Sequence, residues 1–254
     1  SDARESYRAS LMSRVAGTKT ELSADEIAHM LAVWSACIRR SVEKSLALGG
    51  GLCPTYFAYN VTAYHQDEAG LHPDAIELVR MPDFLEGQVR WLRLNRPMAD
   101  KQKLVKNVQE SRLYDHKLNM YKVNAALGEA SYEIGRAHAF TPGWLENESI
   151  WLHMEYKYLL ELLRAGLYNE FAEAFHKAAV PFLDPTVYGR SPLENSSFIA
   201  SSANPDPVIH GKGFVARLSG STAEFLSIWQ IMMLGRNLFT MQDGQPVSYT
   251  HLRA

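Results

Sequence analysis

Residues 139–156 read AFTPGWLENESIWLHMEY, a turn followed by the start of a helix. The tripeptide TPG at 141–143 has the composition of a turn. Beyond it, apolar side chains recur at helical spacing, which predicts a helix over 150–165. Gly166 stands where a left-handed residue commonly ends a helix.

This stretch gathers side chains that suit a sugar ligand. The flat ring of Trp144 would cover the apolar face of a pyranose, while Glu146 and Asn147 would bond its hydroxyls. Tyr56 lies in an aromatic segment, 53–64, that would line the same groove. These four residues form the predicted sugar site. The alternative is a buried, capped helix start, with the aromatic rings packing a strand or loop onto helices.

Composition narrows the class of protein. The chain has 254 residues and a formal net charge of −2 without a basic stripe, so we expect no nucleic-acid partner. Cys37 and Cys53 are its only cysteines and show no metal-ligand spacing, which indicates a reducing, cytoplasmic compartment and no metal. The longest apolar run, 225–234, is too short to span a bilayer, so no membrane partner is expected.

The two ends of the chain look unlike those of a natural protein. Ser1 stands where an initiating Met would be expected, and residues 247–254 resemble the translated read-through of a sequencing adapter. We therefore treat 247–254 as a non-native tail and 1–246 as an internal piece of a longer protein.

Local signals predict several further elements. Ser23 and Glu26 have the spacing of a capping box, and the helix that follows must end at the three glycines 49–51. Segments 75–80 and 88–94 are predicted as short strands, and 67–74 as a loop.

A second motif has the composition of an anion site. Ser219-Gly220-Ser221-Thr222 leads into an apolar helix, and the free N–H groups of a helix start favour phosphate. The alternative is an ordinary Ser or Thr N-cap.

Three stretches together resemble a known enzyme family. They are PGWLENESIWLH at 142–153, LSGSTAEF at 218–225, and the proline-containing loop at 182–206. All three resemble the C-terminal half of the catalytic domain of inverting glycoside phosphorylases, the cellobiose phosphorylase type and its larger β-glucan phosphorylase relatives. The resemblance covers most of 50–240 and implies a mainly α fold, a partial (α/α)6 barrel (six-hairpin glycosidase-like) with a few short strands and long loops.

The resemblance also implies a reaction. Inorganic phosphate would be the co-substrate, and no cofactor would be needed. Phosphate would attack the anomeric carbon of a β-linked glucan or oligosaccharide and release an α-sugar 1-phosphate, while a carboxylic acid protonates the leaving oxygen. By position in the motifs, His153, Gly220, Ser221 and Thr222 would contact phosphate, and Glu146 and Asn147 would contact sugar.

Departures from the family pattern refine these expectations. Leu145 replaces a lysine that touches the acceptor sugar, and Glu148-Ser149 replaces a Gly-Gly pair, which favours a β-glucan other than cellobiose. The general-acid aspartate would lie upstream of Ser1, so the piece alone should be inactive. We also allow for a homodimer of the parent protein.

Two other interpretations remain open. One is an inverting glycoside hydrolase or glucan synthase domain, with a carboxylate pair drawn from Glu133, Glu146, Glu155 and Glu194. The other is a non-catalytic helical scaffold. Both enzymatic interpretations predict that His153 and Ser221 face one pocket with Glu146.

Overall fold

The computed structural model describes residues 2–13, 21–215 and 219–248. The chain divides into two compact units, Ser1–Lys44 and Ser45–Ala254, which are treated separately below. The expected tail at 247–254 is described only in part: residues 247 and 248 belong to a strand, and 249–254 lie outside the described residues.

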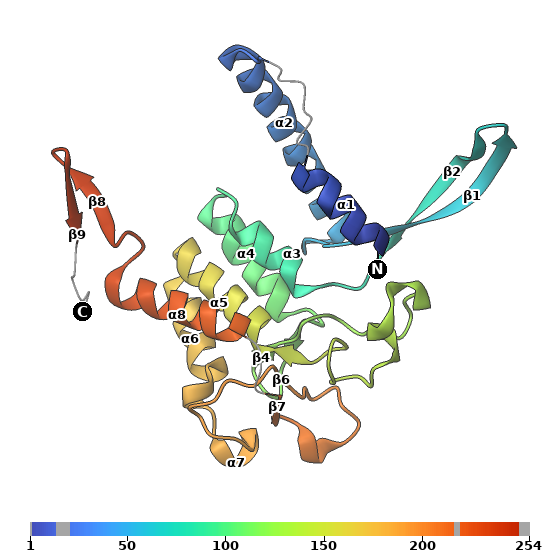
Figure 1. The fold of residues 1–254 in the computed structure, drawn as a ribbon. Coiled ribbons are helices and arrows are strands. Elements are labelled where there is room, and N and C mark those ends of the chain that lie inside the picture. Colours follow the sequence, from blue (N-terminus) through green and yellow to red (C-terminus); the bar gives the residue numbers. More distant parts are fainter. Residues whose placement is uncertain (1, 14–20, 216–218, 249–254) are drawn as a thin grey trace. The chain divides into compact units, whose positions relative to one another are not determined.

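Helices account for much of the described chain (Figure 1). In chain order the α-helices are α1 (Asp2–Ser13), α2 (Ala24–Gly49), α3 (Leu85–Leu92), α4 (Met98–Gln109), α5 (Leu152–Ala165), α6 (Tyr168–Ala178), α7 (Pro185–Tyr188) and α8 (Ser219–Leu234). Single 3-10 turns are η1 (Tyr132–Ile134), η2 (Arg136–Ala139), η3 (Val180–Phe182) and η4 (Pro207–Ile209).

The strands form small antiparallel sheets. They are β1 (Phe57–Asp67), β2 (Gly70–Arg80), β3 (Tyr114–Asp115), β4 (Met120–Tyr121), β5 (Ile150–Trp151), β6 (Phe198–Ile199), β7 (Gly213–Phe214), β8 (Phe239–Gln242) and β9 (Gln245–Ser248). Three of the sheets are two-stranded, and the fourth has the order β5-β6-β7.

The expected fold class, a mainly α partial (α/α)6 barrel, is wrong. The described residues form a mixed α and β chain with several small antiparallel sheets and no clear helical barrel. The largest departure is the β1–β2 hairpin, which pairs Phe57 with Arg80 and Asp67 with Gly70. Its turn is stabilised by the Asp67 carboxylate, which accepts the backbone N–H groups of Ala69 and Gly70.

Some of the predictions made from local sequence signals are confirmed, and others are wrong. The capping box is confirmed: the Ser23 N–H donates to Glu26 Oε2 (2.8 Å), and the Glu26 N–H donates to Ser23 Oγ (3.2 Å). The end of α5 at Gly166, with φ of 82°, is also confirmed. The strand predicted at 88–94 is wrong, because those residues belong largely to α3. The loop predicted at 67–74 is shorter, since Gly70 already begins β2.

Helix α5 is the centre of the second unit's core. It packs against α3, α6 and α8. Leu152, Leu159, Leu160 and Leu162 are fully buried along it. Burying a leucine side chain contributes about 1.5–3 kcal/mol, so this helix accounts for a large share of the unit's hydrophobic stabilisation.

The three-stranded sheet ties three distant loops to the start of α5. Ile150 pairs with Ile199 and Trp151 with Phe198, and β6 in turn pairs with β7. The ring of Trp144 sits edge-on to Phe198 (centroids 5.0 Å apart) and to Phe214 (4.4 Å apart). The loop at 139–151 is therefore held by residues about 50–70 positions later.

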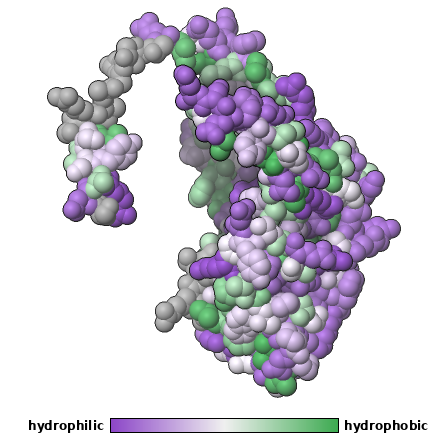
Figure 2. Space-filling view, turned by 90° about the vertical axis from the view of Figure 1, so that its right-hand side faces the viewer, coloured by the Kyte–Doolittle hydropathy of each residue, from purple (hydrophilic) through white to green (hydrophobic). Residues whose placement is uncertain are grey.

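Apolar side chains also remain on the surface. Figure 2 shows apolar residues (green) interspersed among hydrophilic ones (purple) on the face turned to the viewer. Four apolar side chains of α2 that recur at helical spacing are among the exposed ones, since Ile27, Leu31, Trp34 and Ile38 are all more than two-fifths exposed.

Gly143 is required by the turn that precedes the site loop. The φ angle of Gly143 is 75°. A Cβ atom added there would lie 2.5 Å from the backbone nitrogen of Asn204 and 2.9 Å from the Cβ of Asn204. We expect Gly143→Ala to lower the free energy of unfolding by at least about 2 kcal/mol, from left-handed strain plus the clash. Denaturant unfolding followed by circular dichroism would measure this.

The matched control is Gly128→Ala, where an added Cβ meets nothing within 4 Å and φ is not left-handed. That variant should stay within about 0.5 kcal/mol of the parent chain. Equal effects of the two substitutions would contradict the role assigned to Gly143.

Glu155, in α5, makes the free energy of unfolding of the chain depend on pH. Its side chain is fully buried, and Oε2 accepts the Tyr121 N–H at 2.9 Å. Burial raises the pKa of Glu155 from 4.5 to about 8, against a smaller lowering by that hydrogen bond. Between these pH values the folded chain holds a proton that the unfolded chain has lost, so stability falls as pH rises, by about 1.4 kcal/mol per pH unit.

Glu155→Gln removes the titrating group and keeps an oxygen to accept the Tyr121 N–H. Unfolding free energies measured at pH 5, 6, 7 and 8 should fall less steeply for the variant than for the parent chain. Parallel pH profiles would contradict a buried, protonated Glu155.

Candidate functional site

A cavity of about 400 Å³ lies beside the start of α5. Most of its wall is apolar or aromatic, with Tyr56, Phe84 and Trp151 supplying the rings. Glu146 and His153 add ionisable groups to the same wall. A mostly apolar cavity with a few polar groups is the usual form of a small-molecule site.

A tight turn presents Glu146 to this cavity. Trp144 and Asn147 exchange backbone hydrogen bonds of 3.1 Å on either side of the turn. Leu145 inside the turn has φ of 48°, and Glu148 just beyond it has φ of 59°. A non-glycine residue in the left-handed region costs about 1–3 kcal/mol and persists only where its surroundings hold it.

The surroundings of this turn do hold it. The Asn124 side chain accepts the Glu148 N–H (2.6 Å) and donates to the Glu146 carbonyl (2.5 Å). The Glu148 carboxylate forms a buried ion pair with Lys122 Nζ at 2.7 Å. The Leu145 carbonyl accepts the Trp151 indole N–H at 2.7 Å. Strained residues fixed on several sides are common at functional sites.

Only one of the two Glu146 carboxylate oxygens has a hydrogen-bond partner among the described residues. Oε1 accepts Arg136 Nη2 at 2.8 Å. Oε2 is buried and has no hydrogen-bond partner among the described residues. A buried carboxylate oxygen without a donor is costly, so a ligand hydroxyl at this point would be stabilised.

His153 stands in the first turn of α5. Its ring lies edge-on to Trp151, with centroids 5.5 Å apart, and Nδ1 is buried without a partner among the described residues. Burial lowers the pKa of His153, and the Lys157 charge one turn later lowers it further, while Glu86 acts in the opposite direction. The imidazole therefore favours its neutral form, with one N–H donor and one acceptor.

Tyr56 supplies a ring on the more open side of the cavity. It is 58% exposed and stacks on Phe84, with centroids 6.1 Å apart and an interplanar angle of 28°. An exposed ring backed by a second ring is well placed to cover the flat face of a sugar.

The other two predicted sugar residues do not line this cavity. Trp144 packs between Phe198 and Phe214 instead. The Asn147 side chain is buried and donates to the Phe140 carbonyl at 2.7 Å. Both residues help to form the turn that carries Glu146. From the sequence alone, residues that form this turn could not be told apart from residues that contact a ligand.

The predicted phosphate residues are placed in two parts of the second unit. His153 lines the cavity, whereas Gly220, Ser221 and Thr222 lie in the first turn of α8 and are absent from the described cavity wall. Ser221 is buried and Thr222 exposed. Leu218, which opens the matched motif, lies outside the described residues.

The carboxylates considered for a hydrolase do not gather here. Among the described residues lining the cavity, Glu146 is the one carboxylate. Glu155 lies in the core, Glu194 pairs with Arg190, and Glu133 lines a different cavity.

Sequence reasoning missed most of the cavity wall, including Trp151, Phe84 and Asn124. Trp151 was assigned to the apolar stripe of a helix, yet it forms strand β5. Phe84 and Asn124 pair across an isolated bridge and come from segments with weak periodicity. The tyrosine and phenylalanine content of 53–64 was the signal for Tyr56, and the 142–153 motif was the signal for Glu146 and His153.

Metal clusters and membrane spans are not seen among the described residues. Within them, no group of three or more His, Cys, Asp or Glu side chains is placed to hold a metal ion. Nor does any described helix combine the length and apolar character needed to cross a bilayer.

The environment of His153 predicts a low titration midpoint. Two-dimensional NMR of the imidazole nitrogens should place its pKa below 6.5 in the parent chain. Lys157→Gln should raise that pKa, because a neighbouring positive charge is removed. Lys177→Gln, which removes an exposed lysine from α6, should leave it unchanged. A parent value at or above the ordinary one would contradict the burial of His153.

Comparison with known proteins gives no family assignment. No family model matches the chain, and no curated protein sequence matches it closely enough to count as a relative. The geometry of the cavity and the resemblance of the motifs are therefore the basis of the function proposed next.

Proposed function

We propose that the cavity beside α5 binds a glucosyl unit of a β-linked glucan or oligosaccharide. The observation that carries the proposal is that Glu146, whose Oε2 has no hydrogen-bond partner among the described residues, lines the same cavity as Tyr56 and Trp151. Rings and a carboxylate acceptor are the two contacts that a pyranose needs, one for its C–H face and one for its hydroxyls.

We further propose that the parent protein cleaves the bound β-glucoside by phosphorolysis with inversion, releasing an α-sugar 1-phosphate. The motif resemblance supports this reaction, and so does the single described carboxylate of the cavity. A second carboxylate would be needed to activate water in a hydrolase and would repel a phosphate nucleophile. In this proposal His153 donates its N–H to phosphate, Gly220, Ser221 and Thr222 supply further donors, and the enzyme works in a cytoplasmic setting.

The sugar site is tested by calorimetric titration of this chain with cellotriose, laminaritriose and sophorose, with α-linked maltotriose for comparison. At least one β-linked sugar should bind in preference to maltotriose. Glu146→Gln should weaken that binding about tenfold, as expected for a lost hydrogen bond to a charged group. Tyr56→Ala should weaken it as well.

The matched control is Glu194→Gln, since Glu194 is also paired with an arginine (2.7 Å to Arg190) and lies outside the cavity. It should bind as the parent chain does. Binding that survives Glu146→Gln unchanged would overturn the site.

The reaction is tested on this chain joined to the upstream sequence of its reading frame. Sugar 1-phosphate should form from β-glucans only when inorganic phosphate is present, and His153→Ala should abolish it. Free sugar formed equally without phosphate would replace phosphorolysis with hydrolysis and leave the sugar site standing.

A further inference from the structure

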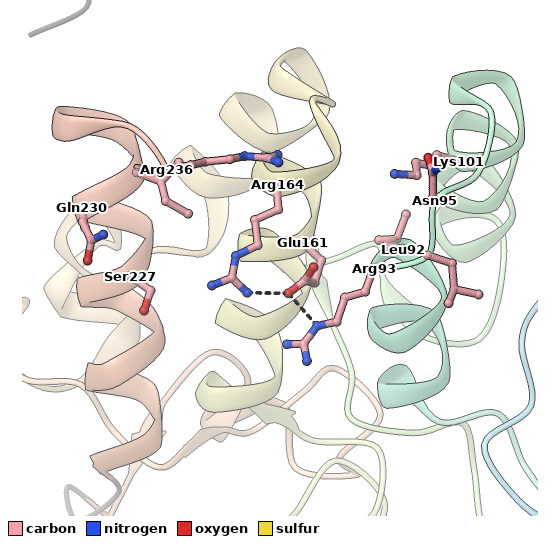
Figure 3. A pocket seen from close by; sticks show the side chains of 11 residues that line it. Leu92, Arg93, Asn95, Lys101, Glu161, Arg164, Ser227, Gln230 and Arg236 are labelled. Carbon is pink, nitrogen blue, oxygen red and sulfur yellow. Dashed lines mark hydrogen bonds and ion pairs between the residues drawn. The ribbon is translucent and has the colours of Figure 1, made fainter. Parts of the chain in front are cut away.

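A second cavity, of about 590 Å³, lies near the other end of α5 (Figure 3). Its wall comes from the end of α3, the start of α4, the last turns of α5, and α8 with the residues that follow it. It shares no lining residue with the cavity that contains Glu146 and His153. Whatever it binds is therefore separate from the proposed sugar site.

The charge of this cavity is strongly one-sided. Four cationic side chains and one carboxylate line it: Arg93, Lys101, Arg164, Arg236 and Glu161. The whole chain carries a net charge of −2, so this local excess of positive charge is not a reflection of overall composition. Cations concentrated in a concave site raise the local concentration of anions.

Glu161 holds two of the arginines in place. Its side chain is only 2% exposed, and Oε1 accepts both Arg93 Nε (2.8 Å) and Arg164 Nη1 (2.9 Å). Figure 3 shows the two arginines meeting this carboxylate, Arg93 from the residue that follows α3 and Arg164 from α5. Each guanidinium retains further N–H donors after this contact, so both forks are preorganised for a second anion.

The other two cations are not neutralised by the protein. Among the residues that the structure describes, Lys101 and Arg236 have no ion-pair partner. In Figure 3 the Arg236 side chain points from the end of α8 toward α5, while the Arg164 guanidinium turns toward Glu161. An anion between the cations would relieve their repulsion.

Neutral polar groups complete the wall. Asn95, Ser227 and Gln230 add amide and hydroxyl groups beside the cations. The described lining contains no aromatic ring, so nothing here would stack on a nucleotide base. Hydroxyl groups on a ligand would find partners, whereas a base would not.

We propose that this cavity binds a phosphate dianion, either free or as the phosphate ester of a small polyol such as a sugar. The arginine forks match two oxygens of a phosphate, and the lysine supplies a point charge. The volume suits a molecule of hexose phosphate size. This site stands independently of the proposed phosphorolysis, which uses His153 and the start of α8.

The test is calorimetric titration of this chain with inorganic phosphate, glucose 6-phosphate and glucose at constant ionic strength. The two phosphate compounds should bind saturably and glucose should not bind at this site. Tighter binding of glucose 6-phosphate would assign the ester, and equal binding would assign free phosphate. Absence of saturable binding by both would overturn the proposal.

Two double variants separate the cavity from general charge attraction. Lys101→Gln with Arg236→Gln should weaken phosphate binding at least tenfold. Lys103→Gln with Arg112→Gln removes the same charge from residues outside the cavity and should leave binding within twofold. Equal losses in the two variants would overturn the proposal.

His153→Ala separates this cavity from the proposed reaction site. Phosphate binding that persists in His153→Ala and is lost in the Lys101/Arg236 double variant assigns the anion to the second cavity. The reverse pattern would place phosphate at His153 and overturn the inference, while leaving the proposed function intact.

Discussion

The backbone of residues 121–125 is the constraint on which the site depends, because it is hydrogen-bonded on both of its sides. On one side the Val123 carbonyl accepts the Leu85 N–H at 2.9 Å, and the Ala125 N–H donates to the Asp83 carbonyl at 2.8 Å. On the other side the Val123 N–H donates to the Ser149 carbonyl at 2.8 Å. One extended segment thus joins the start of α3 to the loop that carries Glu146. Buried backbone groups must be paired, so the two flanking loops cannot shift independently.

Side chains of the same segment stabilise the strained turn. Lys122 neutralises the buried Glu148 carboxylate, and Asn124 bonds the backbone on both sides of Asn147. Left-handed backbone at Glu148 is therefore held by partners more than twenty residues away. The result is a fixed backbone on both sides of the Glu146 side chain. Preorganisation of this kind lowers the entropy lost on binding.

Sequence reasoning succeeded where the determinants are local and failed where they are distant. A capping box and a left-handed glycine act within four residues, so the start of α2 and the end of α5 were predictable. Gln88 was assigned to a strand, yet its amide bonds both backbone groups of Cys53 from within α3. That contact spans 35 residues and leaves no periodic signal. The barrel expectation failed for a related reason, since β5 pairs with β6 and β6 with β7, and these segments carry no strand pattern of their own.

The two buried carboxyl groups of α5 show why burial alone does not reveal a site. Glu155 forms no ion pair among the described residues, and burial raises its pKa to about 8, so it stays a neutral acid within the core at neutral pH. Glu161, less than two turns later, is as well buried but is met by Arg93 and Arg164. A buried carboxylate is tolerated when it is paired, and the pairing brings two guanidinium groups to the rim of a cavity. Two glutamates on one helix therefore have different roles. Glu155 is a neutral part of the core, whereas Glu161 fixes the arginines of a cationic cavity. The difference comes from Arg93, which follows α3 and pairs with Glu161.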